Sequence, residues 1–444
     1  MYKESKINFK AINKLAIPAI ISGIAEPLLS ITDTAVVGNI SVNSTESLAA
    51  VGIAGSFISA IIWILAQTRS AISATIAKYL GAKKLHEIDT LPGQIIGLNF
   101  LLSLFIMAVT MTFTREIFQL YNAEGIILDL AVSYYNIRAL GYPLTLFVFA
   151  TFGIFRGLQN TFWPMVISIV GASLNIGLDF LLVYGIDGVI NPMHVEGAAW
   201  ASVISQAVMA ILALYLVVTK TPFSLRIRVP LNKEIPNILK ISLNLIIRTF
   251  ALNIALYLAN SYATGYGKDY IAAQTIAFQI WLFFAFFIDG YASVGNIVSG
   301  KLLGERNFKK MWKLSMKLTR YAILVAFVLM ATCFVFYKPI GSLFSNEQTV
   351  LNLFYDVFWI VLLMQPINAI AFVFDGIFKG LAEVVTLRNL LLISTFLGFW
   401  PAIVITDQFD LKLYGIWIAF TVWMLMRSGV LVFIFKKRYL AKNM

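Results

Sequence analysis

The stretch PLTLFVFATFGIFRGL at residues 143–158 recurs in altered form as PINAIAFVFDGIFKGL at residues 366–381. Seven of these 16 positions are identical, and the offset between the two stretches is 223 residues. The same offset aligns residues 48–81 with residues 271–304 without a gap, with eight identities in 34 positions. One offset that serves two separated segments indicates two copies of one fold. Both opening stretches also contain a G-x-x-x-G pattern, which predicts close packing between helices.

The composition indicates that both copies lie in a lipid bilayer. Of the 444 residues, 59% are hydrophobic and 13% are charged, and the mean hydropathy is +0.83. Soluble domains carry about 25% charged residues. The backbone of a segment that crosses the bilayer must satisfy its hydrogen bonds internally, which favours helices of about 20 residues. Twelve apolar runs of sufficient length are predicted, with the following approximate bounds: 14–38, 47–80, 93–114, 128–153, 162–185, 196–218, 237–263, 270–302, 314–338, 350–378, 387–406 and 413–435.

These runs predict an all-α integral membrane protein of twelve transmembrane helices in two six-helix lobes. The N-terminal lobe is expected at residues 1–218 and the C-terminal lobe at residues 237–444. A basic, proline-containing stretch at residues 219–236 is the expected cytoplasmic linker. Because six is an even number, both lobes begin on the same side of the membrane. They are therefore expected to form a parallel repeat related by a pseudo-two-fold axis along the membrane normal.

The distribution of Lys and Arg predicts the orientation of the chain. If both termini are cytoplasmic, 26 of the 34 Lys and Arg residues fall in the termini and the inner loops. Only four fall in outer loops, and four lie within predicted spans. This is the positive-inside pattern. We expect a multi-pass protein of the cell membrane (inner or plasma membrane) with cytoplasmic termini. The net charge of +12 is then a topological signal and does not indicate nucleic-acid binding.

Several residue types argue against an enzyme, a bound metal or a bound nucleotide. Cys333 is the only cysteine, and His86 and His194 are predicted on opposite sides of the membrane. The stretch GNIVSGK at 295–301 matches the beginning of a phosphate-binding loop, but Leu302 follows where Ser or Thr is needed for magnesium. That stretch also lies in a predicted transmembrane helix. We expect no enzymatic activity and no cofactor.

Four polar residues in the N-terminal lobe are predicted to share one pocket. At a rise of about 1.5 Å per residue, Asp33 and Asp179 lie roughly 7 Å and 9 Å from the outer ends of their helices. Asn175 is one turn deeper than Asp179 on the same helix face, and Ser202 lies at a similar depth in its helix. Through the repeat offset, Leu, Gly and Ala stand at the second-lobe positions that correspond to Asp33, Asn175 and Asp179. Because these polar residues are present in only one of the two copies, we expect them to serve the function of the protein and not the framework that both copies share.

The chemistry of this pocket fits cation coupling in two ways. Two neighbouring carboxylates cannot both stay ionised cheaply, which suits the uptake of a proton. Carboxylate, amide and hydroxyl oxygens could equally bind sodium. The sequence predicts a cation- or proton-coupling site and leaves both ions open, with the proton as the first hypothesis.

Four further charged residues are predicted to form two ion pairs. Glu26 and Arg69 lie on adjacent, antiparallel helices of the first lobe, and Arg248 and Asp289 lie on the corresponding helices of the second lobe. The order of acid and base is reversed between the two lobes. Because a charge within the membrane is costly unless it is paired or functional, we expect the pairs Glu26–Arg69 and Arg248–Asp289. Either pair could line a substrate pathway or serve the structure alone.

The motifs around the predicted pocket resemble those of the multidrug and toxic compound extrusion (MATE) family, and within it the DinF-like branch. EPLLSITDTAVVG at residues 26–38 is similar to the family's helix-1 motif, with the aspartate at the expected position. SLNIGLDFLLVYG at residues 173–185 is similar to the helix-5 motif, including its asparagine and aspartate. GAAWASVIS at residues 197–205 resembles the helix-6 motif, with Ser202 where a threonine is usual.

The resemblance extends over nearly the whole chain. GIFRGLQNT at residues 153–161 resembles the end of the family's helix 4, with Asn160 in place of the usual aspartate. DGYASVGNIVSGKLLG at residues 289–304 and FVFDGIFKG at residues 372–380 resemble features of the DinF-like branch. The helix-7 acid of the other major branch is missing, because Arg248 is the only charge in the middle of that helix. This difference favours coupling in the N-terminal lobe.

The resemblance implies a monomeric secondary transporter in the bilayer. Such a protein exports amphipathic, often cationic small molecules by alternating access, driven by inward flow of protons or sodium. A flippase for lipid-linked precursors would share the architecture and would need cavity cations, for which Arg69, Arg138 and Arg248 are candidates. A channel or membrane enzyme is less consistent with the absence of a selectivity loop and of a catalytic constellation. The sequence does not predict a role for Asp375, and it does not predict a specific role for Arg138.

Overall fold

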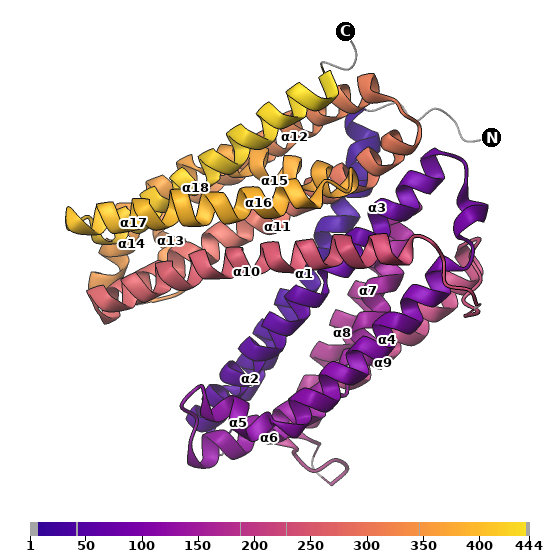
Figure 1. Ribbon diagram of the computed structural model, residues 1–444. Coiled ribbons are helices and arrows are strands. Elements are labelled where there is room, and N and C mark those ends of the chain that lie inside the picture. Colours follow the sequence, from indigo (N-terminus) through magenta and orange to yellow (C-terminus); the bar gives the residue numbers. More distant parts are fainter. Residues whose placement is uncertain (1–7, 41–42, 187, 228, 346, 441–444) are drawn as a thin grey trace. The chain divides into compact units, whose positions relative to one another are not determined.

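The computed structural model describes residues 8–40, 43–186, 188–227, 229–345 and 347–440, without the side chains of residues 25–31, 34, 44 and 440. Helices dominate these ranges (Figure 1), and an isolated bridge between Ile186 and Ile190 is the extended pairing found within them. The first half of the chain forms α1 (Phe9–Val37), α2 (Ser44–Leu65), α3 (Gln67–Gly81), η1 (Leu85–Ile88), α4 (Leu91–Thr112), α5 (Thr114–Gln119), α6 (Gly125–Ala139), α7 (Tyr142–Gly157), α8 (Phe162–Tyr184) and α9 (His194–Lys220). The second half forms α10 (Ile235–Tyr266), α11 (Lys268–Gly304), α12 (Phe308–Val335), α13 (Tyr337–Ser342), α14 (Gln348–Leu363), α15 (Gln365–Gly380), α16 (Val384–Ile393), the π-helix η2 (Ser394–Phe399), α17 (Trp400–Gln408), α18 (Lys412–Phe435) and the π-helix η3 (Lys436–Leu440).

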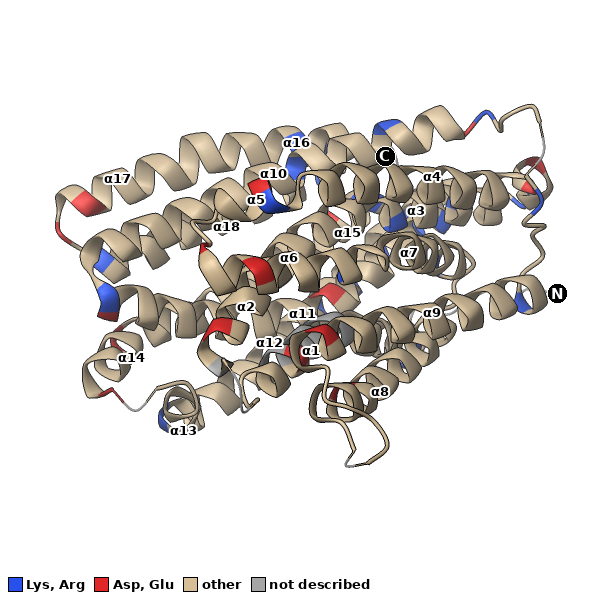
Figure 2. Cartoon of the chain, turned by 90° about the horizontal axis from the view of Figure 1, so that it is seen from below, with Lys and Arg blue, Asp and Glu red and all other residues tan. Residues whose placement is uncertain are grey.

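The twelve predicted spans agree with this set of helices. Among the residues that the structure describes, nine helices are long and apolar enough to cross a membrane, and two bent helix pairs raise the number to eleven. The 29-residue helix α1 coincides with the remaining predicted span. Figure 2 shows long uncharged stretches along the helices, with much of the charge near helix ends and connecting segments. The predicted all-α fold of twelve spans is therefore confirmed.

A helix is bent at the same point in each copy of the repeat. The axes of α6 and α7 differ by 46°, and those of α14 and α15 differ by 50°. Pro143 and Pro366, which are related by the 223-residue offset, stand in the first turns of α7 and α15. Proline has no backbone N–H and fixes its own φ, so it is tolerated at a helix start and interrupts a continuous helix. The repeated proline thus explains the repeated bend.

The G-x-x-x-G patterns bring two helices close together in each copy, as predicted. A Cβ atom on Gly153 of α7 would lie 2.9 Å from the carbonyl oxygen of Arg69 on α3. A Cβ atom on Gly376 of α15 would lie 2.0 Å from the carbonyl oxygen of Ala292 on α11. Arg69 and Ala292 are themselves related by the 223-residue offset. Both copies therefore use the same register of helix contact, which any side chain at these glycines would obstruct.

The chain divides into two compact units, which differ somewhat from the predicted lobes. The unit named here the N-unit comprises Ile21–Tyr79 and Lys84–Leu239, and therefore includes the predicted linker. The C-unit comprises the start of α1 up to Ile20, the short stretch Leu80–Lys83, and the chain from Lys240 onward. The first turns of α1 belong to the C-unit because they pack on α11.

Two contacts fix α1 on α11 within the C-unit. The hydroxyl of Tyr291 donates a hydrogen bond to Asn13 Oδ1 at 2.9 Å. Gly290 lets α1 approach closely, because a Cβ there would lie 2.2 Å from Ile20 and 3.0 Å from the carbonyl oxygen of Ala16. One long helix therefore contributes residues to both units.

The linker is held against α4 of the N-unit by backbone contacts. Gln94 accepts a hydrogen bond from the backbone N–H of Asn232 at 2.8 Å and donates one to the carbonyl oxygen of Pro230 at 3.1 Å. Gly93 lies directly beneath Leu225, whose carbonyl oxygen would be 2.6 Å from an added Cβ. The basic stretch is thus a packed part of the N-unit.

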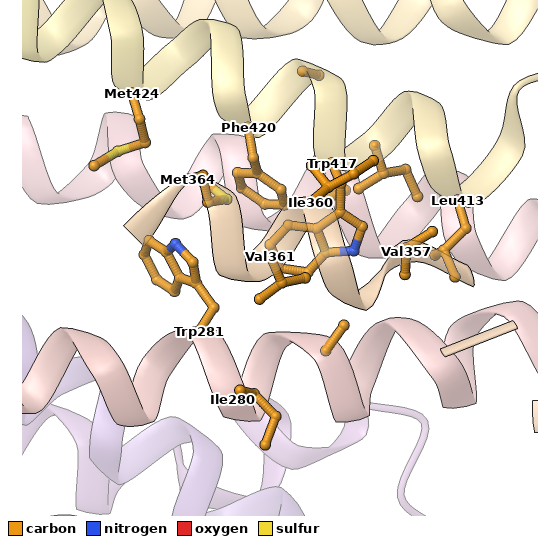
Figure 3. Packing of buried hydrophobic residues seen from close by; sticks show 14 of the residues in the cluster. Ile280, Trp281, Val357, Ile360, Val361, Met364, Leu413, Trp417, Phe420 and Met424 are labelled. Atoms are coloured by element: carbon orange, nitrogen blue, oxygen red, sulfur yellow. The ribbon is translucent and has the colours of Figure 1, made fainter. Parts of the chain in front are cut away.

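The core of the C-unit is rich in aromatic side chains. Figure 3 shows Trp281 of α11 next to Phe420 and Met424 of α18 and Met364, which stands between α14 and α15. The rings of Trp281 and Phe420 stack with centroids 6.3 Å apart. Trp417 is also buried in this cluster. Aromatic rings supply large buried apolar area and defined geometry, so α11, α15 and α18 are held firmly in place.

Candidate functional site

Asp33 lies at the centre of a buried hydrogen-bond network in the N-unit. Its Oδ2 atom accepts hydrogen bonds from the Tyr134 hydroxyl at 3.2 Å and from Ser202 Oγ at 3.0 Å. Asn175 Nδ2 donates to the same Ser202 Oγ at 3.2 Å. These four side chains are at most 5% exposed. They come from α1, α6, α8 and α9, so the network connects four helices.

Asp179 joins this network through Asp33. It stands one turn from Asn175 on α8 and is fully buried. The carboxyl group of Asp179 is a close electrostatic neighbour of the carboxyl group of Asp33. Two carboxyl groups can form a hydrogen bond only if one of them carries a proton. This arrangement is therefore suited to holding a single shared proton.

The network has more acceptors than donors. Among the side chains that the structure describes, none donates an N–H or O–H to the buried oxygens Asp33 Oδ1, Asn175 Oδ1 and Asp179 Oδ1 and Oδ2. Buried polar atoms are normally satisfied, so an acceptor excess of this kind is an unusual feature. A proton or a metal cation would satisfy these oxygens, because either one brings positive charge to atoms that can only accept hydrogen bonds.

The structure thus brings together all four residues of the predicted pocket. Tyr134 is a fifth member that the sequence analysis missed. A tyrosine within a membrane span needs a partner for its hydroxyl, and Tyr134 stands one turn before Arg138, another polar residue of the same span. The one-turn spacing of Tyr134 and Arg138 was the sequence signal from which Tyr134 could have been predicted as a member of the pocket. We call Asp33, Tyr134, Asn175, Asp179 and Ser202 the Asp33 cluster.

A cavity inside the N-unit opens next to the Asp33 cluster. Its wall includes Asp33 and two of the basic residues noted in the sequence, Arg69 and Arg138. The guanidinium of Arg69 lies 5.5 Å from the ring centroid of Phe149, which also lines the cavity. The cavity therefore combines an acidic end, two cationic side chains and apolar or aromatic surface. Glu26, the predicted partner of Arg69, has a side chain outside the described residues, and the pair Glu26–Arg69 stays a prediction.

The predicted pair Arg248–Asp289 is wrong. Arg248 contacts Asp375 instead, with 2.5 Å between its Nη2 atom and Asp375 Oδ1. Asp289 lies on an exposed face of α11, whereas Asp375 is buried on α15. A buried guanidinium is stabilised by a carboxylate that is also withdrawn from solvent and in direct contact, and Asp375 meets both conditions.

Two more basic side chains surround Asp375. Lys379 Nζ lies 3.0 Å from Asp375 Oδ2, and Arg427 Nη2 lies 4.0 Å from Asp375 Oδ1. We call Arg248, Asp375, Lys379 and Arg427 the Asp375 cluster. The sequence signals for it were Asp375 and Arg427 within predicted spans, but their partners could not be assigned without the arrangement of the helices.

Comparisons with known proteins agree with the fold. The model of the MatE family matches residues 18–181 and 245–404. Protein DETOXIFICATION 42 of Arabidopsis thaliana is 26% identical over 310 residues, which cover 67% of this chain and 56% of that protein. The chain thus spans little more than half the length of that relative. DNA damage-inducible protein F of Escherichia coli (strain K12) is 24% identical over 437 residues, which cover 97% of this chain and 92% of that protein.

Among solved structures, a crystal structure of MATE in the straight conformation has the same fold. It superposes with a TM-score of 0.89 at 24% sequence identity and covers 98% of this chain and 97% of its own. The likeness includes both halves of the chain, and therefore both copies of the repeat.

Proposed function

The chain belongs to the MatE family of transporters, and from the Asp33 cluster we propose that it exports amphipathic, often cationic, small molecules by ion-coupled antiport. The observation that carries this proposal is the excess of buried acceptor oxygens at Asp33, Asn175 and Asp179. Such a site changes its charge and its hydrogen bonds when it gains or loses one cation, which is the property that coupling requires.

We propose the proton as the coupling ion. The closeness of the carboxyl groups of Asp33 and Asp179 supports it, because two neighbouring carboxylates cannot both stay ionised cheaply and a shared proton relieves their repulsion. Sodium is the alternative, since carboxylate, amide and hydroxyl oxygens are its usual ligands in proteins. Either ion would be bound by Asp33, Asn175, Asp179 and Ser202.

The cycle follows from the hydrogen bonds of Asp33. As a carboxylate, Asp33 accepts from Tyr134 and Ser202. Protonation at Oδ1, to which no described side chain donates, removes the negative charge of the carboxylate and so weakens both of these hydrogen bonds. This couples the ion to the positions of α1, α6 and α9. In the outward-open state, cation uptake then releases the substrate outside, and cation release on the cytoplasmic side resets the carrier.

The remaining features fit this scheme. The excess of Lys and Arg in the termini and alternate loops supports cytoplasmic termini in the cell membrane. Phe149, Phe152 and Met209 line the N-unit cavity and supply aromatic and adaptable apolar surface for a substrate. An aromatic wall also attracts organic cations by cation–π contact.

One observation favours a second candidate, a flippase for lipid-linked precursors. Arg69 and Arg138 both line the cavity, and guanidinium groups recognise phosphates. This candidate predicts movement of a lipid-linked sugar phosphate across the bilayer without ion-dependent dye transport.

The test is accumulation of a fluorescent organic cation in everted membrane vesicles that contain the protein. We expect accumulation that stops when the proton gradient is collapsed and that continues without sodium. Asp33→Asn should abolish it while the protein still elutes as a folded species from size-exclusion chromatography. Asp129→Asn is the matched control, since Asp129 is an exposed aspartate of the same unit.

The outcomes separate the candidates. Normal accumulation by Asp33→Asn would show that the coupling assignment is wrong. Dependence on sodium alone would replace the proton with sodium. Scrambling of a lipid-linked sugar without any dye transport would favour the flippase.

A further inference from the structure

The Asp375 cluster contains more positive charge than the acidic side chains described by the structure neutralise. Arg248 of α10, Lys379 of α15 and Arg427 of α18 converge on the one carboxylate of Asp375. The cluster therefore carries a formal charge of about +2 if its ordinary charge states hold. Both arginines and the aspartate are more than nine-tenths buried. Burying charge without a counterion is costly, so the arrangement calls for additional negative charge.

The hydrogen bonds of Arg248 and Arg427 also indicate that the cluster can bind a further negatively charged group. Arg248 donates to Asp375 through Nη2, but its Nε–H is buried without an acceptor. Arg427 donates through Nη1 to Met424 Sδ at 3.1 Å, and a thioether sulfur is a weak acceptor. Arg427 Nη2 is also buried without an acceptor, because the 4.0 Å to Asp375 is too long for a hydrogen bond. Two buried guanidinium groups thus have donors to spare.

Aromatic rings hold one of these guanidinium groups in a fixed position. Arg427 Cζ lies 4.7 Å from the ring centroid of Trp423 and 5.7 Å from that of Phe372. Cation–π contacts use the faces of a guanidinium and leave its edges, which carry the N–H groups, for hydrogen bonds. Arg427 is therefore oriented before any ligand arrives, which lowers the cost of binding a planar carboxylate or a phosphate.

The same aromatic side chains connect the cluster with the buried aromatic core of the C-unit. Phe372 lies 6.1 Å from the ring centroid of Trp281, which stacks on Phe420. Figure 3 shows Trp281, Phe420 and Met424 close together in this part of the C-unit. A cationic cluster beside a row of aromatic rings is matched by a ligand that has one negative charge and a flat apolar body.

We propose that the Asp375 cluster of the C-unit is a binding site for the carboxylate or phosphate group of an amphipathic anion. Arg427 and Arg248 donate to the anionic group, Lys379 adds positive charge, and Asp375 occupies the site as an internal competitor. This inference goes beyond the proposed export of cations, because it concerns another unit and ligands of the opposite charge. It does not depend on the assignment of Asp33.

The test is equilibrium binding to the purified full-length protein in detergent, without any ion gradient. The probe is 1-pyrenebutyrate, an aryl carboxylate, and its matched neutral ligand is 1-pyrenebutanol. Energy transfer from tryptophan to pyrene reports binding. We expect the carboxylate to bind at least about tenfold more tightly than the alcohol, as hydrogen bonds between charged groups provide. Equal affinities in the wild-type protein would overturn the proposal without recourse to any variant.

Two substitutions with opposite expected effects separate a ligand site from a structural ion cluster. Arg427→Gln should weaken pyrenebutyrate binding about tenfold or more and leave pyrenebutanol binding unchanged. Asp375→Asn should strengthen pyrenebutyrate binding, because it removes the internal competitor. It should also increase the rise in melting temperature that the probe causes. A purely structural cluster predicts weaker or unchanged binding of both ligands by Asp375→Asn, and that result would contradict the proposal.

The control is Arg320→Gln. Arg320 is an exposed arginine of α12 in the same unit, so this substitution removes the same charge from outside the cluster. We expect it to leave both affinities unchanged. A tenfold loss of pyrenebutyrate binding in Arg320→Gln would mean that net charge, and not the Asp375 cluster, attracts the anion, and this too would overturn the proposal.

A lipid phosphate and a free amphipathic anion present the same chemistry to the site. Repeating the titration in nanodiscs of phosphatidylcholine and of phosphatidylglycerol distinguishes them. Weaker pyrenebutyrate binding in phosphatidylglycerol alone supports the site with an anionic lipid as the occupant, and equal binding in both supports it with a free anion.

Discussion

The Asp33 cluster and the Asp375 cluster occupy opposite halves of a duplicated chain, and their imbalances are opposite in sign. In the Asp33 cluster, buried oxygens lack donors among the described side chains. In the Asp375 cluster, guanidinium N–H groups lack acceptors, and three basic side chains share one carboxylate. The first arrangement is suited to a cation and the second to an anion. One architecture therefore supports two kinds of electrostatic site.

What the two copies share is backbone geometry. Both copies bend a helix at a proline, and both bring helices together at glycines in the same register. These features depend on residues that act through the backbone or through the lack of a side chain. Charged side chains in the same helices are free to differ, because they do not determine how the helices pack. The duplication thus fixes the framework and leaves the chemistry of each half open.

The largest effect is expected from Asp179→Asn. Asp179 has no hydrogen-bond donor among the described residues, and in the proposed mechanism it shares a proton with Asp33. The amide cannot take part in proton sharing, so ion-driven accumulation of an organic cation in everted vesicles should fall to the background level. Equilibrium binding of the same dye in detergent should change less than about tenfold, because the fold and the cavity remain.

An Asp→Asn substitution in the Asp375 cluster tests whether the two clusters differ in function. Asp375→Asn, the same substitution in the other cluster, should not abolish proton-driven accumulation if the two clusters serve different ligands. Loss of coupling in Asp375→Asn together with normal coupling in Asp179→Asn would reverse the assignment of the two clusters.

A smaller loss is expected from Tyr134→Phe. This change removes one of the two hydrogen bonds to Asp33 Oδ2 and leaves the ring in place. A hydrogen bond to a charged group contributes about 1.5–3 kcal/mol, so we expect the transport rate at limiting proton gradient to fall roughly tenfold. Measurement at several imposed gradients should show a shift in the gradient needed for half-maximal rate.

Tyr135→Phe is the matched control for this effect. Tyr135 is the next residue of α6, and its hydroxyl lies 3.2 Å from that of Tyr142, away from Asp33. It should transport as the wild type does. Equal losses from both substitutions would mean that α6 packing is responsible, and not the hydrogen bond to Asp33.

The sequence was sufficient for the fold because the fold depends on local and repeated signals. Apolar run length predicted the twelve spans, and the repeat predicted the equivalence of the two halves. The glycine pattern predicted close packing between helices, and the structure shows that the partners are α3 for α7 and α11 for α15. The position of α1 could not be predicted in the same way. Its first turns pack on α11 through Gly290 and Tyr291, which are distant in the sequence.

The site was predictable only where depth alone identifies neighbours. Asp33, Asn175, Asp179 and Ser202 were expected at neighbouring depths in the membrane, and the structure brings them together. The partner of Arg248 was not predictable in this way. Asp289 and Asp375 are both acids of the second half, and only the rotation of α11 and α15 about their axes decides which of them faces Arg248. Helices α10 and α11 carry weak hydrophobic periodicity, so the sequence does not fix the rotation of Arg248 and Asp289 about their helix axes.

A loss of stability without a change in coupling is expected from Gly376→Ala. The added Cβ would lie 2.0 Å from the carbonyl oxygen of Ala292, and backbone cannot yield as a side chain can. Overpacking of this kind costs typically about 1–3 kcal/mol, which should appear as a lower melting temperature in detergent. Gly429→Ala is the control, since nothing lies within 4 Å of its added Cβ. A larger loss from Gly429→Ala than from Gly376→Ala would refute the packing argument.

The smallest effect is expected from Arg115→Gln. Arg115 pairs with Asp129 at 2.9 Å, but the two side chains are 57% and 65% exposed. Exposed ion pairs contribute about 0–1 kcal/mol, because water and salt screen them. Arg248→Gln should cost more, about 1.5–3 kcal/mol, since it removes a buried hydrogen bond between charged groups, although Lys379 and Arg427 still compensate the charge of Asp375. Thermal unfolding of both variants in the same detergent measures the difference directly. If the two substitutions lower the melting temperature equally, burial does not determine how much an ion pair contributes to stability in this protein. The contrast between the buried and the exposed pair would then fail.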